Sequence, residues 1–267
     1  MKGYVKGFRV VYPGQYGLIH DHGQYDLSTA LHKKITIKHT GKLACCFCNR
    51  SIKKVYQGGY CFPCMQNLAR CDLCVVKPEL CHFHNGTCRE PEWGLKHCMQ
   101  PHIVYASFTS GMKIGLTRKE RLKNRWLEQG ALGAAALLET NSRYHAGLIE
   151  SYVAKGMADK TNWRKMLAQE SLPNHIWDEH KDHILELLNE SLLQHADVVK
   201  EYNLLEPKWF DLDIDVCVPQ KIKSIKPAAD SPIEGTLRAF RGHYMVFDDA
   251  VVNMRSLVGY ELEIMVS

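Results

Sequence analysis

Short apolar runs punctuated by Gly, Pro and acidic residues occupy both ends of the chain, a pattern typical of β-strands joined by turns. The first runs cover residues 4–11, 16–20 and 34–39, and alternation returns at 209–226 and in the final hairpins. The residues that follow Gly14 resemble those that follow Gly242, which indicates either a degenerate repeat or a chance likeness of two hairpins. A true repeat would let the two ends pair as one β unit.

The middle of the chain has a different pattern. Two apolar runs, 103–108 and 112–117, flank Thr109-Ser110-Gly111, which predicts a hairpin. A charged helix over 118–129 ends at Gly130, a strand follows at 134–139, and a second helix is predicted for 143–157. The predicted order is therefore β-β-α-β-α. Apolar residues at three- and four-residue spacing then predict a long helix over 174–203.

Composition adds a mild positive charge and many cysteines to this picture. The 267 residues carry a net charge of +5, which permits nucleic-acid binding but also fits an ordinary solvated surface. We find neither a membrane-spanning apolar run nor a signal-peptide core, so we expect a soluble, cytoplasmic protein that has no membrane partner. Ten of the 11 cysteines lie between Cys45 and Cys98, which favours metal binding over disulfide bonds.

The first cysteine group has the spacing of a zinc ribbon. Cys45 and Cys48 form one C-x-x-C pair, and Cys61 and Cys64 form another after 12 intervening residues. Four thiolates give Zn²⁺ a closed tetrahedral shell, so we predict a structural ion without catalytic function. Cys46 falls outside this spacing, and reduced structural cysteines are the alternative interpretation.

The second group has more donors than one ion needs. We predict Cys71, Cys74, Cys81 and Cys88 as ligands of a second Zn²⁺, with Cys98 or His84 as the substitute. A redox pair at Cys71 and Cys74 is a weaker alternative, because no thioredoxin-like βαβ pattern surrounds it. The chain would then hold one or two structural zinc ions, which replace a hydrophobic core in this Gly- and Pro-rich stretch.

The central β-β-α-β-α region resembles the GIY-YIG nuclease domain. Tyr105 stands at the end of the first motif, and Lys113-Ile114-Gly115 takes the place of the second, with Lys for Tyr. Arg125, followed by Trp126, fits the arginine of the first helix, and Glu150 fits the metal-binding glutamate of the second. The resemblance covers roughly a quarter of the chain, and its short motifs are moderately specific.

This resemblance implies a phosphodiesterase site. Glu150 would hold Mg²⁺ or Mn²⁺, Tyr105 would assist as general base, and Arg125 would bind the phosphate. Lys113 would supply a point charge or act as base, and Arg118 and Arg121 would extend the nucleic-acid-binding face. Taken singly, each of these residues also has an ordinary structural role: a strand aromatic, a surface ion pair or a solvated helix position.

A second resemblance spans most of the chain. The stretch CDLCVVKPELCHFHNGTCREPEWG, with RW-x-x-QGA and D-K-T-N-W downstream, is similar to an uncharacterised prokaryotic family of unknown function, family 2797 of its series. That family implies architecture and little chemistry.

Together these observations predict an α+β protein with a GIY-YIG-like β-β-α-β-α central domain, a cysteine-rich zinc-binding segment and β-rich terminal regions. The expected boundaries are 1–43, 44–100, 101–170, 171–205 and 206–267. The leading hypothesis is a zinc protein that binds DNA or RNA and cleaves it in a divalent-metal-dependent reaction. The alternatives are a non-catalytic nucleic-acid-binding protein and a protein–protein adaptor.

Overall fold

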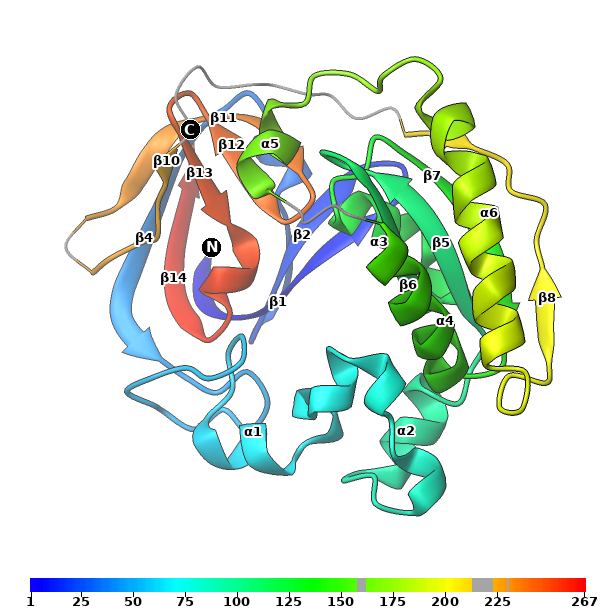
Figure 1. Cartoon of the computed structure of the whole chain (residues 1–267). Helices are drawn as coiled ribbons and strands as arrows, with labels where there is room; N and C mark the ends of the chain where they lie inside the picture. Colours follow the sequence, from blue (N-terminus) through cyan, green and yellow to red (C-terminus); the bar gives the residue numbers. More distant parts are fainter. Residues whose placement is uncertain (158–161, 213–222, 230) are drawn as a thin grey trace. The chain divides into compact units, whose positions relative to one another are not determined.

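The computed structural model describes residues 1–157, 162–212, 223–229 and 231–267 of a mixed α+β chain (Figure 1). The chain forms two compact units. The first contains Met1–Asn67, Leu127–Gly130 and Ile214–Ser267, and the second contains Leu68–Trp126 and Ala131–Asp213. Each unit has its own sheet. Among the described helices, we find none with an apolar stretch long enough to cross a membrane.

A nine-stranded sheet dominates the first unit, in the order β10-β13-β12-β11-β4-β14-β1-β2-β3. Its strands are β1 (Lys2–Val11), β2 (Gln15–His20), β3 (Gly23–Asp26), β4 (Lys34–Leu43), β10 (Lys223–Ser224), β11 (Ile233–Arg241), β12 (Tyr244–Phe247), β13 (Ala250–Asn253) and β14 (Tyr260–Val266). The pair β10–β13 is parallel, and the other pairs are antiparallel. Inward-facing aliphatic side chains such as Leu18, Ile35, Ile37 and Leu262 are completely buried.

The order of strands supports an internal repeat. Each end of the chain runs through three strands, a 3₁₀ turn and a fourth strand: β1-β2-β3-η1-β4 and β11-β12-β13-η7-β14, where η1 is Ser28–Ala30 and η7 is Met254–Leu257. The sheet reads β3-β2-β1-β14 from one edge and β13-β12-β11-β4 toward the other, so the two repeats exchange their last strands. The two ends of the chain therefore pair, as the repeat hypothesis expects.

The second unit contains the predicted β-β-α-β-α order (Figure 1). Its sheet runs β6-β5-β7-β8, and β9 also pairs with β7. The strands are β5 (His102–Phe108), β6 (Met112–Arg118), β7 (Gly133–Thr140), β8 (Tyr202–Leu204) and β9 (Phe210–Asp211). The helices of the chain are α1 (Phe62–Asn67) in the first unit, then α2 (Pro91–His97), α3 (Leu122–Glu128), α4 (Arg143–Gly156), α5 (Trp163–Ala168) and α6 (Ile176–Gln194).

The two faces of this sheet differ in what covers them. Val104 and Ala106 of β5 lie in one apolar core with residues of α4 and α6. Side chains alternate between the faces of a strand, so Tyr105 points to the opposite face. Lys113 and Gly115 pair with Ser107 and Tyr105 and therefore share the face of Tyr105. This arrangement separates two groups of predicted site residues.

Several predicted boundaries differ from the observed ones. The long helix ends at Gln194 instead of continuing to residue 203, because the chain turns there and then forms β8. The predicted zinc segment 44–100 is divided between the units at Asn67 and Leu68. Most of the predicted strand 209–226 lies outside the described residues. Asn162 caps α5 by accepting hydrogen bonds from two backbone N–H groups.

Candidate functional site

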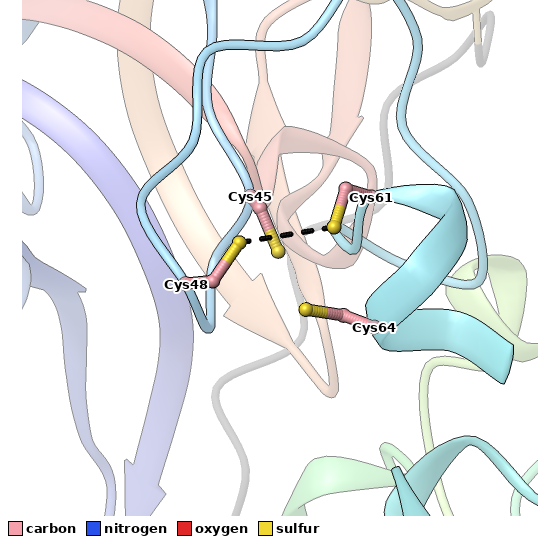
Figure 2. A group of neighbouring side chains, drawn as sticks. All are labelled: Cys45, Cys48, Cys61 and Cys64. Carbon is pink, nitrogen blue, oxygen red and sulfur yellow. Dashed lines mark hydrogen bonds between the residues drawn. The ribbon is translucent and has the colours of Figure 1, made fainter. Parts of the chain in front are cut away.

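Four cysteine sulfurs gather at one point of the first unit. The Sγ atoms of Cys45, Cys48, Cys61 and Cys64 all lie within 4.8 Å of one another, and Figure 2 shows them pointing inward from the loop after β4 and from the start of α1. The Sγ atoms of Cys48 and Cys61 are 3.8 Å apart. A tetrahedral site with Zn–S bonds of about 2.3 Å places its sulfurs about 3.8 Å apart. The group could therefore bind a metal such as zinc, with little change in position.

Backbone hydrogen bonds fix the loop after β4 and the turn that precedes α1 in this arrangement. The N–H of Cys45 donates to the carbonyl of Arg50 at 2.9 Å, and the N–H of Cys46 donates to that of Gly59 at 2.8 Å. Gly59 has a φ of +119° and lies against Val258, so a side chain is excluded there on two grounds. Cys46 contributes this backbone contact and no sulfur to the group, as its spacing predicts.

The electrostatics of the group also favour a cation. Burial raises the pKa of the Cys45 thiol, but the backbone N–H groups of Cys48, Cys61 and Phe47 outweigh burial and lower that pKa to about 6. Burial and the three neighbouring sulfurs raise the pKa of Cys64. One thiol thus ionises easily while its neighbour resists a second negative charge. A divalent cation removes that repulsion and lets all four thiolates form.

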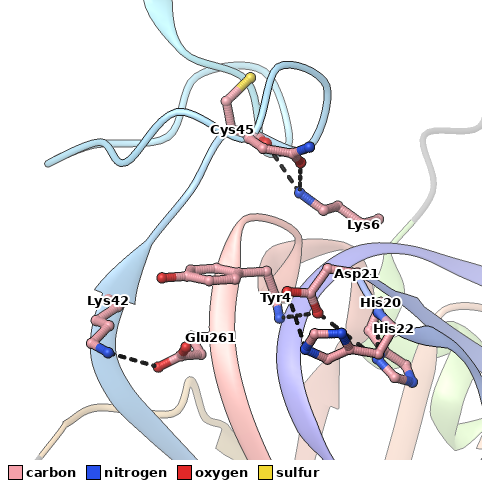
Figure 3. A network of polar contacts seen from close by, with 9 residues as sticks. Tyr4, Lys6, His20, Asp21, His22, Lys42, Cys45 and Glu261 are labelled. Carbon is pink, nitrogen blue, oxygen red and sulfur yellow. Dashed lines mark hydrogen bonds and ion pairs between the residues drawn. The ribbon is translucent and has the colours of Figure 1, made fainter.

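A lysine from β1 supports the first loop. The Lys6 ammonium donates to the carbonyl oxygen of Cys45 at 3.2 Å and to the side chain of Asn49 (Figure 3). Asn49 directly follows Cys48 and has a φ of +62°, a left-handed conformation that Asn adopts more readily than most residues. On the same strand, the N–H of Tyr4 donates to the carboxylate of Asp21 at 2.9 Å, and Asp21 lies between His20 and His22.

The second cysteine group lies in the second unit, where four of its members share one cavity. Cys74, Cys81, Cys88 and Cys98 line one small cavity, together with Asp72 and His82. Cys71 is buried but is not among the residues that line this cavity. His84 contacts the ring of Tyr144 and likewise does not line it.

Among the GIY-YIG-like residues, Tyr105 and Gly115 form a close pair. Tyr105 is fully buried, and its ring lies directly on Gly115: a Cβ added to Gly115 would stand 2.7 Å from the Tyr105 Oη. Trp126 of α3 meets the same ring edge-on at 6.2 Å. The glycine is therefore needed because the tyrosine occupies the space that a side chain would fill. Lys113 is half-buried on the same face.

Glu150 lies on α4, the helix that covers the opposite face of the sheet. Burial and, after it, the negative charge of Glu79 raise the pKa of Glu150 to about 7, while Arg143 opposes them. Glu79 belongs to the 3₁₀ turn Pro78–Leu80, which packs against α4 at Gly147. The structure thus brings Glu150 together with Glu79 and Arg143, whereas Tyr105 and Lys113 extend from the other face.

The remaining predicted residues lie at the end of β6, in the following turn and on α3. Arg118 forms an ion pair with Glu120 at 3.2 Å. Burial lowers the pKa of His102 to about 4, and the charges of Arg143 and Arg118 contribute to this shift. Burial also lowers the pKa of Arg143, and the charge of Arg125 adds to it, so α3 and the start of α4 each bring a guanidinium to one region. Arg121 is exposed in the turn that precedes α3.

Comparison with known proteins now gives the chain a family. Residues 32–262 match the family model described as "Protein of unknown function (DUF2797)", which covers most of the chain. The chain belongs to the DUF2797 family. No curated protein and no solved structure matches it. Of the two resemblances in the sequence, the one to family 2797 is therefore confirmed, while the GIY-YIG likeness stays a prediction.

In this DUF2797 chain, Arg143 and Glu79 act on predicted site residues, but neither was identified from the sequence. Arg143 donates through Nη2 to the carbonyl of Val75 at 2.7 Å and acts electrostatically on both Glu150 and Cys98. Glu79 approaches Glu150 across 71 positions of sequence, and no short motif contains both. A signal existed only for Arg143, which directly follows the capping residue Ser142 at the start of a predicted helix.

Proposed function

We propose that this protein is a zinc-binding protein that binds DNA or RNA through the segment 113–125, hereafter the basic segment. The observation that carries the proposal is charge density. The basic segment contains six Lys or Arg residues and one acidic residue. Its net charge of +5 equals that of the whole chain. The rest of the chain is therefore neutral overall, and the excess charge is concentrated on β6, the following turn and α3 (Figure 1).

Several of these cations lie at the surface of the second unit. Arg118 pairs with Glu120, and Lys119 pairs with Glu139 at 2.9 Å. The side chains of Arg121, on the turn, and Lys123, on α3, are exposed to solvent. A concentrated cationic surface of this kind attracts the phosphate backbone without regard to sequence, because binding releases condensed counterions. The proposal therefore concerns nucleic-acid binding in general and names no base sequence.

The zinc group has a structural part in this proposal. Four thiolates complete the coordination shell of Zn²⁺ and leave no position for a substrate. In the first unit the ion would fix the loop after β4 and the turn before α1. Gly59 of that turn contacts Val258, which lies just before β14. Nucleic-acid contacts are assigned to the second unit alone.

The test is a salt titration with a matched control. The double variant Arg121→Gln/Lys123→Gln removes two charges from the basic segment, and Lys33→Gln/Lys34→Gln removes two exposed charges from the first unit. We expect the first variant to bind labelled single- or double-stranded DNA or RNA more weakly, with a salt slope lower by about 1 to 2. The control variant is expected to match the wild type. Equal binding by the two variants would refute the assignment.

We propose divalent-metal-dependent phosphodiester cleavage as a second candidate function, in the manner of the GIY-YIG-like domain. The β-β-α-β-α order and the Tyr105–Gly115 pair support it, and so does the carboxyl pair of Glu79 and Glu150. Two neighbouring carboxylates suit Mg²⁺ or Mn²⁺, which relieves their mutual repulsion. The position of Tyr105 on the opposite face weighs against a general base at that residue. In this arrangement Arg143 supplies a positive charge that acts on Glu150.

Cleavage assays with paired variants test this second function. Wild type is compared with Glu150→Gln, Glu79→Gln and the exposed control Glu186→Gln, with Mg²⁺ or Mn²⁺ and single- and double-stranded DNA and RNA. We expect loss of cleavage in the first two variants and full activity in the third. Absence of cleavage by zinc-loaded wild type that still binds these substrates would leave the binding function and remove the enzymatic one.

A further inference from the structure

The segment from Leu68 to His97 has little regular structure with which to stabilise itself. It consists of four 3₁₀ turns of three residues each, at 69–71, 73–75, 78–80 and 83–85, followed by the seven-residue helix α2. Large side chains are exposed along it, including Leu73, Val76 and Leu80. Its buried positions are mainly small: Ala69, Cys71, Pro78, Cys81 and Gly94. Segments of this kind are usually held by disulfides or by a metal.

The interior of this segment is a cavity lined with thiols. Cys74, Cys81, Cys88 and Cys98 line it: Cys74 lies in the turn 73–75, Cys81 and Cys98 directly follow the turn 78–80 and α2, and Cys88 lies in the loop before α2. Their sulfur atoms do not form a group within 4.8 Å of one another, as those of the Cys45 group do, so binding of one ion would draw them together. The cavity volume is about 10 Å³, which is roughly the room that one water-sized sphere needs. A single ion fits a space of this size, whereas a cluster of several metal and sulfide atoms needs more.

A second donor set exists at the same place but is already engaged. Asp72, Cys74 and His82 bring their donor atoms within 4.8 Å of one another. However, the Asp72 carboxylate forms an ion pair with Arg89 at 2.7 Å and accepts a hydrogen bond from the N–H of Cys74. His82 holds the hydroxyl of Thr87 at 2.7 Å through Nδ1. A guanidinium at that carboxylate competes with a metal cation, so Asp72 serves to orient the Cys74 loop.

We propose that Cys74, Cys81, Cys88 and Cys98 bind a second Zn²⁺ in the second unit, independently of the Cys45 group. Four thiolates and one ion would explain why three short helical elements and the loop before α2 bring cysteines to one cavity. Cys71 then packs as a small apolar residue and is not a ligand. This assignment replaces Cys71 of the sequence-based prediction with Cys98.

The proposed ion would also fix the positions of the two elements that carry Glu79 and Glu150. Cys98 accepts a backbone hydrogen bond from the N–H of Arg143 at 2.8 Å through its carbonyl oxygen. Cys81 directly follows the turn Pro78–Leu80 that presents Glu79 to α4. The metal centre therefore holds both the start of α4 and the turn that packs at Gly147. This consequence stands whether or not the chain cleaves nucleic acid.

Metal analysis of the full chain tests the proposal. We expect two zinc ions per wild-type chain by mass spectrometry of the native protein or elemental analysis. Cys98→Ser and Cys74→Ser should each reduce the content to one ion, and the matched control Cys71→Ser should retain two. Loss of one ion from Cys71→Ser with two retained in Cys98→Ser would overturn the ligand set. One ion in wild type, lost on Cys48→Ser, would overturn the site itself.

A measurement on wild type alone guards against variants that do not fold. After replacement of zinc by ¹¹³Cd, NMR should give two cadmium resonances, both in the range of four-sulfur coordination. A single resonance, or a second one typical of mixed nitrogen or oxygen ligation, would refute the four-cysteine site. Iron together with acid-labile sulfide in the purified chain would likewise refute a single zinc ion there.

Discussion

The buried carboxyl of Glu150 makes the stability of the second unit depend on pH. Its pKa is raised from 4.5 to about 7, first by burial and then by Glu79. A carboxyl with a raised pKa in the folded state binds more protons folded than unfolded between these two values. Stability is therefore highest below pH 4.5 as far as this group is concerned. It falls as the pH rises through the window from 4.5 to about 7.

The size of the effect follows from the same values. Each pH unit of difference in pKa corresponds to about 1.36 kcal/mol, so the full contribution of Glu150 is about 3 kcal/mol. Glu150→Gln keeps the shape and hydrogen-bonding capacity of the side chain and removes its charge. We therefore expect this variant to resemble wild type at pH 4.5 and to be more stable by about 3 kcal/mol at pH 8.

The assay is urea unfolding followed by tryptophan fluorescence at several pH values, without added magnesium or manganese. Other titrating groups cancel in the difference between wild type and Glu150→Gln. The matched control Glu186→Gln, exposed on α6, should show no such pH-dependent difference. Glu79→Gln should lower the pKa of Glu150, which NMR of the carboxyl carbons measures directly. A difference that is constant between pH 4.5 and 8 would refute the reasoning.

Three other perturbations have expected outcomes. Zinc chelation or Cys48→Ser should lower the melting temperature of the first unit, because the Cys45 group loses its cation; unchanged melting would show that packing alone suffices. Gly115→Ala should cost about 1–3 kcal/mol in urea unfolding, because its Cβ would meet Tyr105, while Gly14→Ala, with open space around it, should cost less than that. Gly147→Ala should increase proteolysis within residues 68–98, because its Cβ would stand 2.5 Å from the Pro78 Cβ; an unchanged digestion pattern would contradict this packing.

The elements with local signals were predictable from the sequence. Alternation and helical spacing gave the β-β-α-β-α order, and the hairpin at Ser110-Gly111 lies where its turn residues place it. The first metal group was predictable because the C-x-x-C spacing itself brings paired thiolates together. In both cases the information lies within a few residues of the feature.

Features that depend on distant pairing were not predictable. The exchange of β4 and β14 between the repeats requires knowledge of strand partners, which alternation does not encode. The approach of Glu79 to Glu150 depends on how a 3₁₀ turn meets Gly147, and the presence of Cys98 instead of Cys71 in the cavity lining depends on the path of α2. Spacing alone favoured Cys71, because it stands at C-x-x-C distance from Cys74.

The exchanged strands determine which parts of the first unit can fold while the chain is being synthesised. The Met1 ammonium group donates to the carbonyl of Ile264, 263 positions away, and β4 has both of its partners, β11 and β14, at the far end of the sequence. During synthesis β1–β3 can form a meander, but β4 and the adjoining cysteine loop remain without their sheet partners until β11 and β14 have been made. High contact order of this kind slows folding and leaves strand edges open for longer. Early capture of zinc by the Cys45 group would give this waiting segment a local fold before its sheet is complete.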